Sequence, residues 1–333
     1  GIEVPNRAAA LVRLGSILLY PEFQKAERLT FALGRNVSGE PVFADIAKMP
    51  HLLVAGATGS GKSIMIHSLL TSLVYKNSPA MLRLILVDPK RVELSVYDGL
   101  PHLMAPVITE TRKAIGALRW AIGEMERRYQ LLLEEGARDI AGYNRGGTRL
   151  PYLLVVIDEL ADLMVSYGRE VEGSIIRLAQ MSRATGLHLV VSTQRPSVEV
   201  ITGLIKANIT SRIALQVASQ IDSRTILDTA GAEKLLGSGD LLFVSAELSK
   251  PKRIQGAYLS EGEVKKVVTF IREHNAAPPP SEEVFSVEAN GENGAAALAA
   301  FDGYAAEGDD DELYGDAVEV VRAAKKASAS LLQ

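Results

Sequence analysis

A glycine-rich segment of eight residues holds the clearest chemistry in this sequence. Residues 56–63 read Gly-Ala-Thr-Gly-Ser-Gly-Lys-Ser and match the spacing G-x-x-x-x-G-K-[ST], directly after an apolar run. Glycines let such a loop curl, so that backbone N–H groups and a helix N-terminus surround phosphate. In this pattern Lys62 reaches the β- and γ-phosphates and the Ser63 hydroxyl takes Mg²⁺, so the predicted ligands are ATP and Mg²⁺. The residues predicted to hold the nucleotide are Gly56, Ala57, Thr58, Gly59, Ser60, Gly61, Lys62, Ser63 and Ile64. A chance glycine-rich turn is the alternative.

Two adjacent carboxylates end a second apolar run. Residues 153–157 read Leu-Leu-Val-Val-Ile, and Asp158 and Glu159 follow them. Carboxylates in such a place cost free energy unless they meet a cation or leave the core. We expect Asp158 to hold Mg²⁺ and Glu159 to be the base that orients an attacking water, which makes the expected reaction hydrolysis. An acid pair exposed at a strand end is the alternative.

Two further polar residues lie near the predicted strand at 188–192. Gln194 follows this strand, at the edge where parallel sheets bind ligands, and is a candidate γ-phosphate sensor. A capped turn explains the same segment equally well. Arg183 lies at a predicted helix end just before the strand, where arginines commonly satisfy the helix C-terminus. The functional alternative for Arg183 is an arginine finger, which neutralises charge on the γ-phosphate bound to a neighbouring subunit.

These side chains need a sheet to bring them together, and short apolar runs alternate with helix-period segments along the chain. The runs are 52–56, 84–88, 152–158, 188–192 and 212–217, and the helical segments lie at about 62–76, 111–135 and 170–184. Continuous apolar runs are typical of strands that are buried on both faces. We therefore predict an α/β fold with a mostly parallel sheet and helices on both faces.

The composition sets limits on the class of protein. The 333 residues contain no cysteine, which excludes a disulfide framework and a Cys-ligated zinc site. The net charge is −4, but residues 1–272 hold 33 basic and 27 acidic side chains, which is compatible with nucleic-acid binding. Residues 276–312 are rich in Pro, Gly, Ala and acidic side chains and lack Lys and Arg, which predicts a linker. No run approaches the roughly 20 apolar residues that span a bilayer.

Four blocks of the sequence occur in the order of a known family. They are residues 49–63, which include the glycine-rich segment, Val87-Asp-Pro-Lys-Arg-Val-Glu-Leu-Ser-Val-Tyr, residues 193–208, which begin Thr-Gln-Arg-Pro, and Ser223-Arg-Thr-Ile-Leu-Asp. From about residue 34 to residue 272 the chain resembles the FtsK/SpoIIIE family of bacterial DNA translocases. The resemblance implies a RecA-like P-loop ATPase that forms a homo-hexameric ring, threads double-stranded DNA through its pore and moves chromosome ends across a division septum.

The resemblance also assigns residues to DNA and to the ring. It implies contacts to DNA phosphates from the segments around 195–206 and 220–224, and the predicted DNA-binding residues are Arg195, Lys206 and Arg224. Basic side chains suit a translocase, because it must grip the phosphate backbone without reading bases. Gln220 is a departure, since family members often have lysine there. For Arg183 the resemblance favours the arginine finger in trans.

The resemblance divides the chain into four parts. We expect residues 1–33 to be a remnant of a preceding small domain with a linker strand and residues 34–275 to be the RecA-like motor domain. Residues 276–312 are expected to form a disordered acidic linker, and residues 313–333 the truncated start of a winged-helix domain. The family further implies a parent protein that is anchored in the bacterial inner membrane, with this motor part in the cytoplasm, and that contacts division and recombinase proteins.

Two other functions share this chemistry. Related FtsK-like ATPases drive protein export, although they usually carry several ATPase modules in tandem. A small-molecule kinase also uses a P-loop and Mg²⁺, but it must exclude water from its acceptor, and Glu159 argues against it. We therefore expect an ATP-driven DNA motor, with protein export as the alternative.

Overall fold

The parallel part of the sheet contains the predicted strands. The computed structural model of the chain describes residues 11–146, 149–248 and 250–275. Five strands run parallel in the order β7-β3-β6-β5-β4. They are β3 (His51–Ala55), β4 (Leu82–Val87), β5 (Tyr152–Ile157), β6 (Leu187–Thr193) and β7 (Ser211–Leu215). These strands coincide with the five predicted apolar runs, so the predicted α/β fold with a parallel sheet is confirmed. The linker predicted at 276–312 and the winged-helix start at 313–333 lie outside the described residues.

Four antiparallel strands extend the same sheet beyond β7, and the apolar runs did not predict them. β8 (Asp240–Val244) pairs with β7, β9 (Lys252–Gly256) with β8, β1 (Thr30–Asn36) with β9, and β2 (Pro41–Asp45) with β1. Three of them, β2, β8 and β9, mix buried with partly exposed residues. Antiparallel strands with a partly solvated face have this pattern, and a search for continuous apolar runs misses it.

The N-terminal part of the described chain packs into the same core as the rest. Gly34 of β1 has a φ of +148°, and a Cβ atom there would lie 1.9 Å from the carbonyl oxygen of Gln255 in β9, so only glycine permits this close pairing. Ile17 and Phe23, from the first two helices, belong to the hydrophobic cluster that contains Leu52 of β3. The boundary predicted between residues 33 and 34 therefore falls inside a strand and inside one core.

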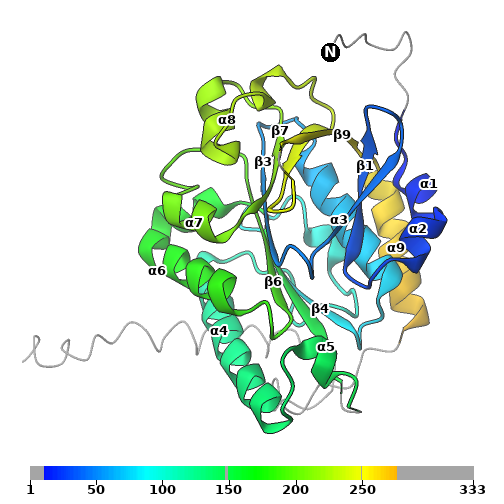
Figure 1. The fold of residues 1–333 in the computed structure, drawn as a ribbon, viewed down its shortest axis with the longest axis vertical. Coiled ribbons are helices and arrows are strands. Elements are labelled where there is room, and N and C mark those ends of the chain that lie inside the picture. Colours follow the sequence, from blue (N-terminus) through cyan, green and yellow to red (C-terminus); the bar gives the residue numbers. More distant parts are fainter. Residues whose placement is uncertain (1–10, 147–148, 249, 276–333) are drawn as a thin grey trace, which may run out of the picture.

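Helices cover both faces of the sheet (Figure 1). One face carries α1 (Leu14–Leu18), α2 (Pro21–Lys25), α3 (Lys62–Lys76) and α9 (Glu261–His274). The other face carries α4 (Thr111–Glu134), α6 (Leu160–Met181), α7 (Gly203–Asn208) and α8 (Gln220–Leu227). Short helical turns lie at α5 (Ile140–Tyr143), η1 (Ser95–Tyr97) and η2 (Ala232–Lys234). In the part of the chain that the structure describes, no helix is both long and apolar enough to cross a bilayer.

The predicted helices agree with α3 and α4 and only partly with α6. This helix begins at Leu160, ten residues before the predicted start, and Tyr167 inside it has a non-helical backbone (φ −143°, ψ 40°). The break at Tyr167 lies in the part of the helix that the periodicity missed.

The strands of the parallel part are buried on both faces, which explains their continuous apolar sequences. Leu52 and Val54 of β3 belong to the cluster under α3, whereas Leu53 and Ala55 belong to the cluster under α4 and α6. All four side chains are 0% exposed. Burial on both faces fixes the register of these strands. The residues that follow their carboxyl ends are therefore held in fixed positions.

Two buried histidines near the amino ends of β3 and β6 make folding sensitive to acid. His51 and His188 are each 2% exposed, and their ring centroids lie 6.4 Å apart. Burial lowers the pKa of His51 to about 3 and that of His188 to about 4. In the unfolded chain both histidines titrate near the usual value of about 6.5. Between these values the unfolded state binds more protons than the folded state, so stability falls as the pH falls.

We expect the free energy of unfolding to fall as the pH drops below 6.5, by about 2 kcal/mol for each histidine at pH 5, since each pH unit is worth about 1.36 kcal/mol. Urea unfolding at pH 7.5 and pH 5.0 measures this loss. In His188→Asn, whose amide can still donate to the Pro50 carbonyl as the histidine Nδ1 does at 3.0 Å, about half of the loss should disappear. An unchanged pH dependence in this variant would assign the effect to other groups.

Candidate nucleotide site

The carboxyl ends of β3, β5 and β6 bring the predicted phosphate loop and the carboxylates together. β6 lies between β3 and β5 in the sheet. The glycine-rich loop follows β3, Asp158 and Glu159 follow β5, and Gln194 follows β6. Because parallel strands end at the same edge, these residues converge on one side of the molecule. The sequence predicted this convergence, and the structure has it.

The backbone of the phosphate loop depends on its glycines. Gly59 and Gly61 have φ angles of +79° and +106°, in the left-handed region that favours glycine. A Cβ atom on Gly61 would lie 2.7 Å from the backbone nitrogen of Gly239, whose N–H donates to the Ser60 carbonyl at 2.9 Å. The loop leads directly into α3, and the positive end of a helix dipole favours bound phosphate.

Lys62 is buried and is held by Asp158, which follows β5, and by Ser192 of β6. Its side chain is 3% exposed. Its Nζ donates to the carbonyl oxygen and to Oδ1 of Asp158, both at 2.7 Å, and to Oγ of Ser192 at 3.2 Å. The ammonium group has three donors, and these three acceptors satisfy them. Lys62 therefore places a positive charge between the loop and the carboxylates.

The carboxylates at this edge offer oxygens that suit a divalent cation. Burial raises the pKa of Asp158, and the charge of Lys62 opposes this effect. Oδ2 of Asp158 and Oδ1 of Asp88, which follows the adjacent strand β4, are buried without a hydrogen-bond partner. Mg²⁺ is commonly bound by one or two carboxylates and completes its shell with phosphate and water. Asp158 and the hydroxyl of Ser63, at the start of α3, therefore fit the predicted metal site.

Glu159 is 0% exposed, and its carboxylate accepts hydrogen bonds from three groups. Thr193 Oγ1 lies 2.6 Å from Oε1, the Gln194 backbone nitrogen lies 3.2 Å from both oxygens, and Lys90 Nζ lies 3.1 Å from Oε2. Burial raises the pKa of Glu159, but these hydrogen bonds together outweigh burial and hold the pKa below its usual value. Glu159 is therefore ionised at neutral pH, as a general base must be.

The side chain of Gln194 contacts the phosphate loop. Thr58 Oγ1 in the loop donates to Gln194 Oε1 at 2.8 Å, while the backbone N–H of Gln194 donates to Glu159. Gln194 thus links the loop to the carboxylate predicted to act on water. This place suits a γ-phosphate sensor, and that role stays a prediction.

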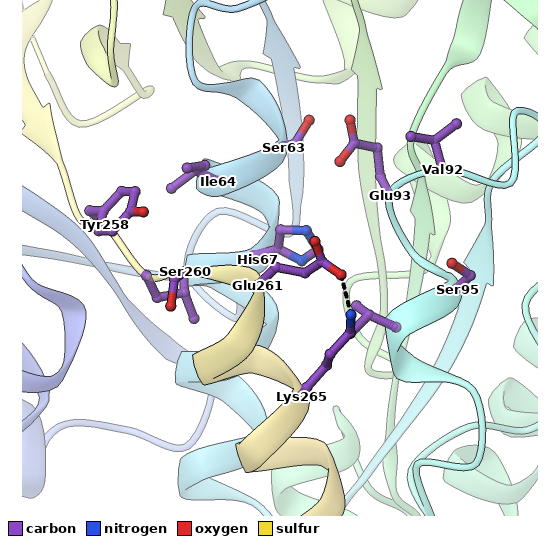
Figure 2. Close-up of a pocket in the computed structure, with 12 residues that line it drawn as sticks. Ser63, Ile64, His67, Val92, Glu93, Ser95, Tyr258, Ser260, Glu261 and Lys265 are labelled. Atoms are coloured by element: carbon purple, nitrogen blue, oxygen red, sulfur yellow. Dashed lines mark ion pairs between the residues drawn. The ribbon is translucent and has the colours of Figure 1, made fainter.

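A pocket of about 420 Å³ lies beside the first turns of α3 (Figure 2). It is lined by Ser63, Ile64 and His67 of α3, by the loop that follows β4, including Val92 and Glu93, and by residues 258–261 and Lys265 at the start of α9. Pockets of about 300–1,000 Å³ commonly hold small molecules. Because Ser63 belongs both to the phosphate loop and to this wall, the pocket adjoins the phosphate site.

In the described chain, the hydrogen bonds of this cluster do not involve the side chains of the remaining predicted residues. Arg183 is exposed and precedes β6, so it lies at the sheet edge opposite the phosphate loop of its own chain. Arg195 and Arg224 are also exposed. Lys206 is 19% exposed and pairs with Asp228 at 2.7 Å. No contact in the described chain therefore tests the predicted finger or the DNA contacts.

Sequence reasoning missed the contribution of the segment after β4. Asp88 Oδ2 accepts the backbone N–H groups of Glu93 and Leu94, both at 2.9 Å, and so shapes the loop that carries Lys90 to Glu159. In the sequence, residues 87–97 were noted only as one of the blocks that resemble the family, and no role in the site was predicted for them. Asp88 could have been found in the sequence, because it is a carboxylate that directly follows an apolar run, as Asp158 is.

The chain is similar in sequence to a known protein family and to named bacterial proteins. The model of the FtsK/SpoIIIE family matches residues 14–151 and 145–198. A Clostridium acetobutylicum protein named DNA translocase FtsK is 51% identical over 341 residues, covering 100% of this chain and 43% of that protein. The Bacillus subtilis protein named DNA translocase SpoIIIE is 48% identical over 345 residues, covering 100% of this chain and 42% of that protein. The chain therefore spans less than half the length of these relatives.

Solved structures have the same fold. The pCW3 conjugation coupling protein TcpA, in its monomer form with ATPγS, gives a TM-score of 0.67 at 29% identity, covering 78% of this chain and 74% of that one. The cytoplasmic domain of the Thermomonospora curvata type VII secretion ATPase EccC gives a TM-score of 0.71 at 26% sequence identity. The match covers 82% of this chain and 35% of that one. The family model and the relatives near 50% identity agree with the blocks found in the sequence, and the chain belongs to the FtsK/SpoIIIE family.

Proposed function

We propose that this chain hydrolyses ATP and uses the free energy to move along double-stranded DNA. One observation carries the proposal, namely the convergence of Lys62, Asp158 and Glu159 at a single sheet edge beside a phosphate loop. This set combines a buried cation, a cation ligand and an ionised base, which are the parts that ATP hydrolysis requires. The ATP analogue in the TcpA structure supports the same assignment.

The nucleotide occupies the loop and the pocket beside it. Its phosphates lie on residues 56–63, and Lys62 exchanges the Asp158 carboxylate for phosphate oxygens. Ser63 and Asp158 would hold Mg²⁺, which would supply positive charge beside the phosphates. The nucleoside end lies in the pocket beside α3, whose volume of about 420 Å³ suits a ligand of that size. Glu159 orients the attacking water, and Gln194 contacts the γ-phosphate.

The proposal that the cargo is DNA follows from the sequence relatives. The fold alone does not choose the cargo, since EccC is named as a secretion ATPase at 26% identity. The relatives near 50% identity are named DNA translocases. Arg195, Lys206 and Arg224 are the proposed contacts to DNA phosphates, in a hexameric ring whose parent protein is anchored in the bacterial inner membrane at the division septum.

The proposed function is tested by phosphate release from ATP with and without linear duplex DNA. We expect strong stimulation by DNA of any sequence, because phosphate contacts carry no sequence information. A protein-export ATPase gives no stimulation by DNA, and a small-molecule kinase gives phosphate transfer to an acceptor instead of release. Either of those two results would contradict the proposed function.

Variants of the proposed contacts sharpen the same test. Arg224→Ala should weaken duplex binding for every sequence and reduce the slope of log affinity against log salt by about 1, since one phosphate contact is lost. Lys206→Ala should have a smaller effect, because Lys206 must first leave Asp228. Lys48→Ala, at an exposed turn after β2, is the matched control. A change in preference between sequences at constant salt slope would contradict the assignment.

A further inference from the structure

The carboxylate of Glu159 is closed off from solvent, and both of its oxygens already accept hydrogen bonds. A carboxylate offers about four lone-pair sites, two on each oxygen. Oε1 accepts from Thr193 Oγ1 and from the Gln194 backbone N–H, and Oε2 accepts from the same N–H and from Lys90 Nζ. Because Glu159 is 0% exposed, an attacking water can reach a carboxylate oxygen only where one of these contacts gives way.

Lys90 is the contact that can leave at the lowest cost. Thr193 is 0% exposed on β6, and the Gln194 N–H is a backbone group fixed by the end of the same strand. The Lys90 side chain is 37% exposed, lies on a loop, and has a second carboxylate within reach, since its Nζ is 3.8 Å from Oδ2 of Asp162. A partly exposed ammonium group can exchange a carboxylate for water, and the buried Glu159 carboxylate then keeps the hydrogen bonds from Thr193 and Gln194.

The loop that carries Lys90 also lines the pocket beside α3. Asp88 Oδ2 fixes the loop through the N–H groups of Glu93 and Leu94. Val92 and Glu93 then form part of the pocket wall, two and three residues after Lys90 (Figure 2). A ligand in the pocket therefore touches the loop that holds Lys90 on Glu159.

We infer that Lys90 is a positioning residue that holds Glu159 back from water in the resting subunit. This inference rests on the proposed function, because it assigns a restraint to the proposed base. Lys90 leaves Oε2 when the occupied site engages DNA, and the freed oxygen then accepts the attacking water. The contact therefore lowers ATP hydrolysis in the absence of DNA.

The test compares wild type, Lys90→Ala and Lys90→Arg by ATP hydrolysis with and without duplex DNA, and by binding of a fluorescent ATP analogue. In Lys90→Ala we expect kcat without DNA to rise about five-fold. This rise corresponds to an activation free energy that is lower by about 1 kcal/mol, since a tenfold change in rate is about 1.36 kcal/mol. The KM for ATP and the affinity for the analogue should stay unchanged. The maximal rate with DNA should also stay unchanged, so stimulation by DNA falls by the same factor. Lys90→Arg, which keeps the charge and the reach, should restore the low basal rate.

Two controls separate this restraint from other effects. Lys48→Ala removes an exposed lysine far from the site and should leave all rates as in wild type. In the Glu159→Gln background Lys90→Ala should give no increase, because the base is already absent. A fall of kcat in Lys90→Ala at unchanged ATP affinity would overturn the inference and make Lys90 necessary for the reaction, and an unchanged basal rate would overturn it as well. If wild type itself fails to hydrolyse ATP, the proposed function fails first, and that result is distinct because it appears without any substitution.

Discussion

Replacement of Lys62 by alanine is expected to abolish tight ATP binding. Lys62 supplies the only cation that the site buries within the described chain, and hydrogen bonds to charged groups contribute about 1.5–3 kcal/mol each. Loss of two phosphate contacts should therefore weaken ATP binding by roughly 10²-fold or more. Equilibrium binding of a fluorescent ATP analogue measures the change. Because Asp158 loses its partner in the core, thermal unfolding must show that the variant is folded.

Glu159→Ala should give the opposite pattern. ATP binding should stay close to that of wild type, whereas hydrolysis should fall by roughly 10²- to 10⁴-fold, the usual contribution of a general base. In the proposed mechanism Glu159 acts on the water and Lys62 on the phosphates, so we expect the two phenotypes to separate. If both variants lost ATP binding to the same extent, Glu159 would be a structural acid at a strand end.

Arg183→Ala should lose most of the DNA-stimulated ATPase activity while each subunit keeps its own phosphate loop. Arg183 is exposed and lies at the sheet edge opposite the loop of its own chain, so a catalytic role requires a neighbouring subunit. Arginine fingers contribute about 10³- to 10⁵-fold to turnover. Steady-state phosphate release with saturating duplex DNA measures the loss, and binding of an ATP analogue should be unaffected.

Mixing two inactive variants distinguishes this role from a structural one. When Arg183→Ala subunits are combined with Lys62→Ala subunits, some interfaces pair an intact arginine with an intact phosphate loop, so ATPase activity should reappear. Co-purification with two different tags must first show that mixed assemblies form. With mixed assemblies present, no recovery at any ratio, together with a lowered melting temperature of Arg183→Ala, would identify Arg183 as a residue that stabilises the end of α6.

The parts of the fold that could be predicted are those whose side chains are buried on every face. β3, β5 and β6 have continuous apolar sequences because helices cover both sides, and polar residues follow their carboxyl ends. The phosphate loop was predicted from its glycine and lysine spacing, and Asp158, Glu159 and Gln194 from their places at the ends of apolar runs. The antiparallel strands β8 and β9 were not predicted, because their partly exposed residues break the apolar runs.

The contacts within the site depend on long-range geometry that spacing does not contain. Lys90 and Glu159 lie 69 residues apart in the chain, and Thr58 and Gln194 lie 136 residues apart. Which lysine meets which carboxylate is decided by the β4–β5 pairing and by the turn that Asp88 holds through Glu93 and Leu94. A sequence shows that each residue follows a strand, but not which strands are neighbours.

The hydrogen bond between the Gly239 N–H and the Ser60 carbonyl has a consequence for the order of folding. It joins residues about 180 positions apart, and Gly239 in turn accepts the N–H of Gly256 from β9. Closing so long a loop costs entropy that only the finished sheet repays. During synthesis, the phosphate loop therefore gains this hydrogen bond only after residues 239–256 have left the ribosome, well after the residues of α3 have been made.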